Sequence, residues 1–135
     1  MASIFSRIIQ GEVPCYKVAE DNQHFAFLDI NPVAEGHVLV VPKVETDYIF
    51  DITEPDYQAL WLFARTVAIG LQKAVPCVKV GVTVIGLEVP HAHIHLVPMQ
   101  SMNDMNFSRP KLNPSREELE RMQKLIASQL ASQLA

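Results

Sequence analysis

The chain has 135 residues, an apolar content of 49 % and a formal charge of −4, which fits one globular domain and excludes a disordered protein or a (β/α)8 barrel of about 250 residues. No apolar run reaches the ~20 residues of a membrane-spanning helix and the charge is acidic, so we expect neither a membrane protein nor a general nucleic-acid binder. Cys15 and Cys77 form no disulfide framework or paired metal motif. The N-terminus lacks the apolar region of a signal peptide, so we expect a cytoplasmic protein.

Short apolar segments separated by turn residues make up the first third of the chain. Ser3 can cap a short helix that stops at Gly11. Residues 16–19 and 24–28 read as two strands joined by a polar turn. Residues 37–41 are the strongest strand of this part, because the run is apolar after its first residue and ends at a proline.

A long helix is predicted over residues 54–75, which Pro76 ends. Its core stripe consists of Tyr57, Leu60, Ala64, Val67, Ala68 and Leu71. Four more apolar residues lie outside that stripe, namely Trp61, Leu62, Phe63 and Ile69. A helix that is apolar on most of its circumference is buried on more than one side, so we expect a homodimer with part of this helix in the interface.

The remainder contains two strands, at 78–85 and 91–97, and a polar, Met-rich stretch at 99–114 that reads as a loop. Ser115 and Glu118 then form a capping box for a C-terminal helix. These elements predict an α+β fold, in which an antiparallel sheet carries one long central helix, a short N-terminal helix and a C-terminal helix.

Three of the five histidines stand in the run 91–95, His-Ala-His-Ile-His. Alternate residues of a strand share one face, so the three imidazoles project together, about 6–7 Å apart. Three titratable rings on an apolar strand oppose folding unless each finds a partner, which indicates a functional site. His37, at the start of a strong strand, is the candidate for a fourth imidazole, whereas His24 reads as a surface or edge residue.

Two chemistries use such a cluster. A neutral imidazole can attack phosphorus and form a covalent phosphoramidate, while neighbouring imidazoles donate hydrogen bonds to the developing charge. Imidazoles also bind zinc or iron, for which Glu88, Asp29 and His37 are available as further ligands. A purely structural role for the three rings is the third reading.

These residues resemble the histidine triad (HIT) family. The run HAHIHLVP is similar to the family signature of three alternating histidines between apolar residues. SIFSRIIQGEVP resembles the family's opening segment, and AFLDINPVAEGHVLVVPK resembles its central block, so the resemblance covers residues 3–98. It is strongest to the Hint-like branch of small nucleotide-binding hydrolases. We therefore expect a HIT domain over residues 1–100, on which a loop and helix at 101–135 pack as an extension.

The resemblance implies a homodimer that hydrolyses or transfers a nucleotide at its α-phosphorus, with a purine nucleotide or nucleoside phosphoramidate as substrate. His93 matches the nucleophile that becomes nucleotidylated, and His95 matches the residue that contacts the phosphate and the leaving group. His91 and His37 match the supporting imidazoles, and Asp29 matches the carboxylate that binds the ribose hydroxyls. The apolar base pocket is matched by Ile4, Phe5, Ile8, Val13, Phe27, Leu28 and Ile30.

The chain departs from the family pattern in two regions. Some Hint-like proteins bind a structural zinc through cysteines where this chain has Ser3 and Ser6, and Glu45 stands where a histidine is common, so we expect no metal and no cofactor. Before the triad, an Asn and a Gln of the pattern are missing and Glu88 replaces a hydroxyl residue. We expect Glu88 to lie near the leaving group and to favour a neutral or cationic one.

Two other functions stay open on the sequence alone. One is a metal-dependent hydrolase that uses the same histidines. The other is a nucleotide-binding regulatory dimer with little turnover.

Overall fold

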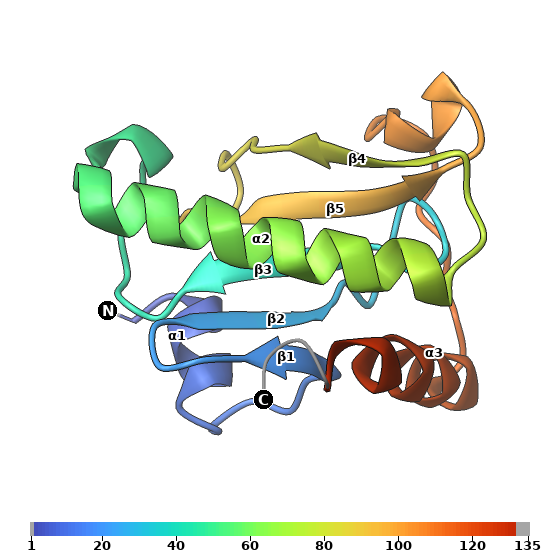
Figure 1. Ribbon diagram of the computed structural model, residues 1–135, viewed down its shortest axis with the longest axis horizontal. Coiled ribbons are helices and arrows are strands. Elements are labelled where there is room, and N and C mark those ends of the chain that lie inside the picture. The colour runs from blue at the N-terminus through green and yellow to red at the C-terminus, as the bar shows by residue number, and fades with distance from the viewer. Residues whose placement is uncertain (1, 132–135) are drawn as a thin grey trace.

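Five strands form one antiparallel sheet in the computed structural model, which describes residues 2–131 (Figure 1). The strands lie in the order β1-β2-β3-β5-β4. Their bounds are β1 Lys17–Glu20, β2 His24–Leu28, β3 Val38–Pro42, β4 Lys79–Thr83 and β5 Ile94–Met99. The helices are α1 Ile4–Ile9, α2 Glu54–Ala74 and α3 Arg116–Leu130, with short 3-10 turns η1 Ile49–Asp51 and η2 Met102–Met105. The predicted α+β class, with its three helices, is confirmed.

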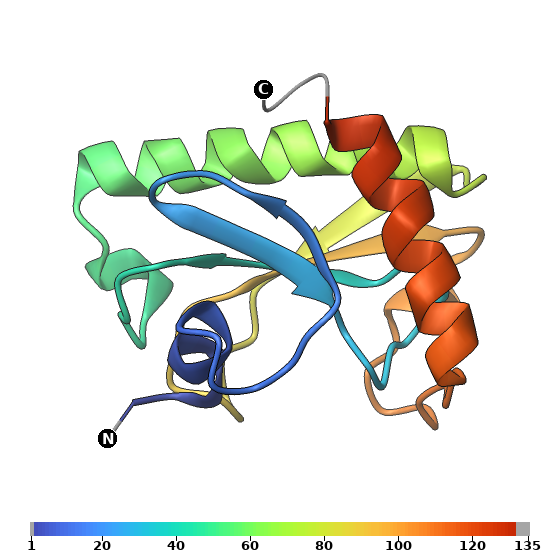
Figure 2. The ribbon, with the colours of Figure 1, turned by 90° about the horizontal axis from the view of Figure 1, so that it is seen from below.

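Helices α2 and α1 lie on opposite faces of the sheet, and α3 runs beside one end of α2 (Figure 2). The main core lies between α2 and the sheet, where Ala26, Leu28, Val38, Val40, Ile94 and Leu96 face the helix. A second apolar cluster lies under α1 on the other face and contains Phe5, Phe25, Phe27, Leu39 and Val41. Because strand residues alternate between faces, the sheet separates a packed core from the face that carries the histidines.

Helix α2 buries most of the predicted stripe, since Leu60, Ala64, Val67 and Leu71 lie in the main core. Phe63, which the sequence analysis set outside the stripe, is only 4 % exposed and belongs to the main core. Tyr57 and Ala68 are half-buried at the margin of this core. Because Phe63 is buried, the outward apolar surface of α2 is smaller than predicted, and it includes Leu62, which is 64 % exposed, and Ile69, which is 36 % exposed.

The interpretation of His24 as a surface or edge residue is wrong. Strand β2 pairs with a strand on each side, and the side chain of His24 shares a face with Ala26 and Leu28. His24 is therefore buried, stacks on the ring of Phe63 at 5.0 Å between centroids, and is paired through Nδ1 with the carboxylate of Asp21. It lies on the α2 face, away from the other histidines.

The last two strands are shorter than predicted. Residues 84–93 leave the β4–β5 ladder, because the backbone N–H of His91 donates to the carbonyl of Val89 and that of Ala92 donates to Thr46. The stretch 99–114 is not a plain loop, since it includes the end of β5 and η2. Within residues 2–131, none of the helices has both the length and the apolar character needed to cross a lipid bilayer.

Candidate active site

Four histidines lie together on the face of the sheet opposite α2. His91, His93, His95 and His37 are each at most 7 % exposed. The ring centroids of His93 and His95 are 4.9 Å apart, and those of His37 and His95 are 5.2 Å apart. Strand β3 brings His37 to the triad because Leu39 pairs with His95. Gly36, just before β3, has φ +86°, and a side chain there would meet Val75 and Pro98, so the turn into His37 requires glycine.

The protonation of His93 is set by the backbone. Its Nδ1 lies 2.8 Å from the carbonyl oxygen of His91, which can only accept, so Nδ1 carries the proton. Burial lowers the pKa of His93 below its ordinary value, which favours the neutral ring. Nε2 of His93 therefore keeps a free lone pair, as a nucleophile must.

His95 has the opposite tautomer. The backbone N–H of Val33 donates to Nδ1 of His37 at 3.2 Å, so the proton of His37 is on Nε2. That Nε2 lies 2.9 Å from Nδ1 of His95 and donates to it, which leaves the proton of His95 on Nε2. Burial lowers the pKa of His37 to about 3 and that of His95 to about 4, so both rings are neutral at pH 7. A ring nitrogen of His93 with a lone pair thus stands beside an N–H donor on His95.

His91 joins the triad to the N-terminal helix. Its Nε2 donates to the carbonyl of Pro42 at 2.8 Å, so its Nδ1 accepts from the hydroxyl of Ser3, also at 2.8 Å. Glu45 accepts from the backbone N–H of Ser3 and from the hydroxyl of Ser6, each at 2.7 Å. These hydrogen bonds lower the pKa of Glu45 to about 2. The positions that the sequence analysis compared with a zinc site therefore form a directly hydrogen-bonded cluster.

Asp29 stands at the end of β2 beside His37. Its Oδ1 accepts from the backbone N–H of Asn31 at 2.9 Å, and its Oδ2 lies 3.8 Å from Nε2 of His37. Burial raises the pKa of Asp29. Asp29, His37 and His95 each offer one ligand atom, all within 4.8 Å of one another, which is a spacing that a metal ion could use after the proton between the two rings had left.

A cavity of about 670 Å³ opens over His93 and His95. One wall contains Asp29, and another is the segment 85–88, which includes the exposed side chain of Glu88. A third wall contains Phe107 and residues 111–113. Sequence reasoning missed this third wall because it lies beyond the family motifs. The sequence signal that could have indicated this wall was Phe107 and Lys111, an aromatic and a basic residue in a mostly polar stretch.

The proposed base-pocket residues do not all lie together. Phe5 and Phe27 are 5.5 Å apart between ring centroids, Phe5 lies 4.9 Å from the ring of His93, and Ile8 packs on the same cluster. Leu28 faces the main core under α2, so its assignment to the base pocket is wrong, because neighbouring strand residues point to opposite faces. The others are more open, with Ile4 40 % exposed, Ile30 56 % exposed and Val13 half-buried.

Comparison with known proteins identifies the family. The family profile of the HIT domain matches residues 10–102. The chain is 38 % identical over 102 residues to the adenosine 5'-monophosphoramidase of Saccharomyces cerevisiae, covering 72 % of this chain and 62 % of that protein. It is 30 % identical over 132 residues to an uncharacterised HIT-like protein of Borreliella burgdorferi, covering 92 % and 95 %.

A solved structure agrees with this match. The chain superimposes on a HIT-like protein from Bartonella henselae with a TM-score of 0.83 at 27 % identity, covering 95 % of this chain and 96 % of that one. The cluster of His37, His91, His93 and His95 thus lies in a sheet whose fold and sequence both match this family. The protein belongs to the histidine triad family.

Proposed function

We propose that the protein hydrolyses or transfers the nucleotidyl group of a nucleoside phosphoramidate through a covalent intermediate on His93. The observation that carries the proposal is the pairing of opposite tautomers on adjacent rings. The Nε2 of His93 has a lone pair, whereas the Nε2 of His95 has a proton to donate. A nucleophile and a hydrogen-bond donor side by side suit attack on a phosphorus centre.

The first half of the reaction transfers the nucleotidyl group to His93. Its Nε2 forms a bond to the α-phosphorus while the P–N bond to the leaving group breaks. The electron pair goes to the departing amine nitrogen, which takes a proton from solvent. The ring of His93 then carries a positive charge, which the carbonyl oxygen of His91 stabilises through Nδ1–H. The N–H of His95 hydrogen-bonds a phosphate oxygen throughout.

The second half regenerates His93. Water attacks the phosphorus, the bond to Nε2 breaks and its electron pair returns to the ring. The products are a nucleoside monophosphate, a proton released to solvent and neutral His93. An alcohol or amine in place of water gives transfer instead of hydrolysis.

Three observations support an adenosine-type phosphoramidate as substrate. The similar yeast protein is named an adenosine 5'-monophosphoramidase. Asp29 is a carboxylate at the cavity wall, which suits a ribose diol. The half-buried Ile8 packs on the buried cluster of Phe5 and Phe27 next to His93, and its open side suits the face of a purine.

The experiment is to trap the intermediate on the whole protein. Brief incubation with an adenosine phosphoramidate followed by acid-free mass spectrometry is expected to show a nucleotidyl adduct on His93. His93→Ala should abolish the adduct and turnover while leaving the fold intact. His95→Ala should slow turnover but still permit some adduct. Near-normal turnover by His93→Ala would contradict the mechanism.

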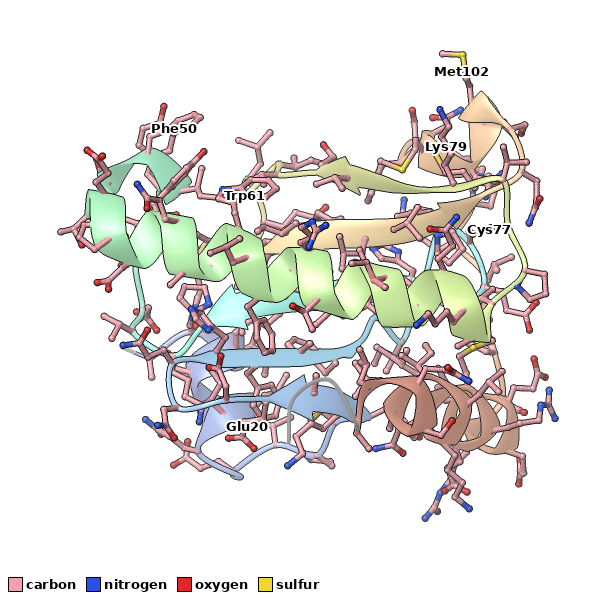
Figure 3. All side chains as sticks on the ribbon, in the orientation of Figure 1. Glu20, Phe50, Trp61, Cys77, Lys79 and Met102 are labelled. Atoms are coloured by element: carbon pink, nitrogen blue, oxygen red, sulfur yellow. The ribbon has the colours of Figure 1, made fainter. Side chains whose placement is uncertain are left out.

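We propose that the enzyme acts as a homodimer. Trp61, on α2, buries its indole N–H without a hydrogen-bond partner among the described residues. Phe50, on η1, is 67 % exposed, and it lies with Trp61 toward the side of the molecule where β4 forms the sheet edge (Figure 3). A monomer leaves the apolar surface around Phe50 and Trp61, and the unpaired edge of β4, in contact with water. A two-fold pair can cover both.

A second candidate is a metal-dependent hydrolase, which the close grouping of Asp29, His37 and His95 favours. A bound metal would coordinate Nε2 of His37 and Nδ1 of His95 and would displace the proton that these two atoms now share in a hydrogen bond. Metal analysis of the purified protein, with turnover measured before and after EDTA, separates the two candidates. Activity that persists in chelator supports the covalent route. Loss on chelation and recovery with zinc supports the metal.

A further inference from the structure

We infer that Lys111, from the segment beyond the HIT-domain match, is the residue that binds the substrate's phosphate and makes the site select nucleotides over nucleosides. The inference rests on the proposed function and assigns the charge recognition within it. The matched family region ends at residue 102. Lys111 nevertheless lines the cavity over His93 and His95.

An anionic phosphate needs a positive charge in this cavity, because its lining is acidic. Among the described residues that line it, Asp29 and Glu88 are acidic and Lys111 alone is basic. Burial lowers the pKa of His93 and of His95, so neither ring supplies a positive charge at pH 7. An anionic phosphate that enters between two carboxylates is repelled unless a cation compensates for them. Lys111 is the described side chain in the cavity that can do so.

The ammonium group of the exposed Lys111 is held at Phe107, whose ring lies next to His95. Its Nζ donates to the backbone carbonyl of Phe107 and lies 5.6 Å from the centroid of that ring. The ring of Phe107 in turn lies 5.0 Å from the ring of His95. The charge of Lys111 also lowers the pKa of His37, which agrees with its position near this side of the site. An ammonium has three donors, so two stay available for phosphate oxygens.

The segment that carries Lys111 is tied to the loop that follows Asp29. The backbone N–H of Leu112 donates to the carbonyl of Pro32 at 2.9 Å. Arg109 donates to the carbonyl of Val33 and forms an ion pair with Asp104 at 3.3 Å. These ties fix the distance between the carboxylate at the cavity wall and the base of the lysine side chain. Phosphate and ribose are therefore recognised by one connected unit.

The test measures binding of AMP and of adenosine to the full chain by calorimetry. Lys111→Met keeps most of the aliphatic stem and removes the charge. Lys124→Met, on α3, makes the same change of net charge at an exposed position outside the cavity lining. We expect Lys111→Met to weaken AMP binding about tenfold and to leave adenosine binding within about twofold. We expect Lys124→Met to change neither, and Lys111→Arg to keep most of the affinity for AMP.

The outcomes separate the inference from the function on which it rests. If the wild type binds AMP and Lys111→Met binds it equally well, the inference is wrong and the proposed function stands. An equal loss for AMP and adenosine would assign Lys111 a structural role and would also overturn the inference. If the wild type binds neither compound, the proposed function fails and the inference fails with it. For phosphoramidate turnover by Lys111→Met, the expected effect is a raised KM with a smaller change in kcat.

Discussion

The Nε2 atom of His37 lies 2.9 Å from Nδ1 of His95, and this hydrogen bond decides which nitrogen of His95 carries the proton. The orientation begins at the backbone N–H of Val33, which donates to the other nitrogen of His37. A backbone group thereby sets the tautomer of a ring two residues from the proposed nucleophile.

Replacing His37 by Phe should remove the preference of His95 for the Nε2-protonated tautomer. Phe fills the buried site but cannot donate a hydrogen bond to Nδ1 of His95. Nitrogen NMR of the wild-type protein should show His95 protonated at Nε2, and the variant should show a mixture of tautomers. We expect kcat to fall at least tenfold. A single unchanged tautomer together with lost activity would mean that His37 acts in another way.

The acid limb of the pH–rate profile should lie below the ordinary histidine pKa of 6.5. Burial lowers the pKa of His93, and protonation of its Nε2 removes the lone pair that attacks phosphorus. The midpoint of the fall in activity should therefore lie below pH 6.5. The check is kcat/KM between pH 4.5 and 8.5. An acid limb centred at or above pH 6.5 would contradict the neutral, buried ring.

Glu45 should stabilise the protein only where it is ionised. Hydrogen bonds from Ser3 and Ser6 lower its pKa from 4.5 to about 2 in the folded state. A lowered carboxyl pKa adds stability that is complete above pH 4.5 and is lost as the pH falls toward 2. Glu45→Gln should therefore lower the Tm at pH 7, and the difference from wild type should shrink below pH 4. Glu117→Gln, at an exposed position on α3, is the matched control and should change little.

Glu88 should select the leaving group. It is exposed and lines the cavity beside His93 and His95, so its charge should disfavour a polyphosphate and tolerate an amine. The measurement is the ratio of kcat/KM for a nucleoside phosphoramidate to that for a dinucleoside polyphosphate. We expect the wild type to prefer the phosphoramidate and Glu88→Ser to reduce the ratio. A wild-type preference for the polyphosphate, or an unchanged ratio in Glu88→Ser, would remove Glu88 as the selector.

Light scattering at micromolar concentration should give twice the chain mass of 15.1 kDa. Leu62→Asp introduces a charge on the outward side of α2, where the native side chain is 64 % exposed, and should shift the species toward a monomer. Leu125→Asp, at a 43 % exposed position on α3, is the matched control and should stay dimeric. A wild-type monomer would refute the dimer.

The sequence by itself determined the elements whose pattern is local. The cap at Ser3, the run that forms β3 and the long periodic segment of α2 each predicted the right kind of structure, because capping and periodicity depend on neighbouring residues. The alternation of histidines also showed that several rings would share one face. The same local rules failed at Phe63 and His24, which meet each other through tertiary packing.

The tertiary structure decided the chemistry within the site. Which nitrogen of His91 and of His95 is protonated depends on partners far away along the chain, namely the carbonyl of Pro42 for His91 and the ring of His37 for His95. The wall that carries Lys111 also joins the site only when the chain returns past β5. Such contacts carry no periodic signal. Hydrogen-bond partners and local charges are set by three-dimensional proximity, which only the packed chain defines.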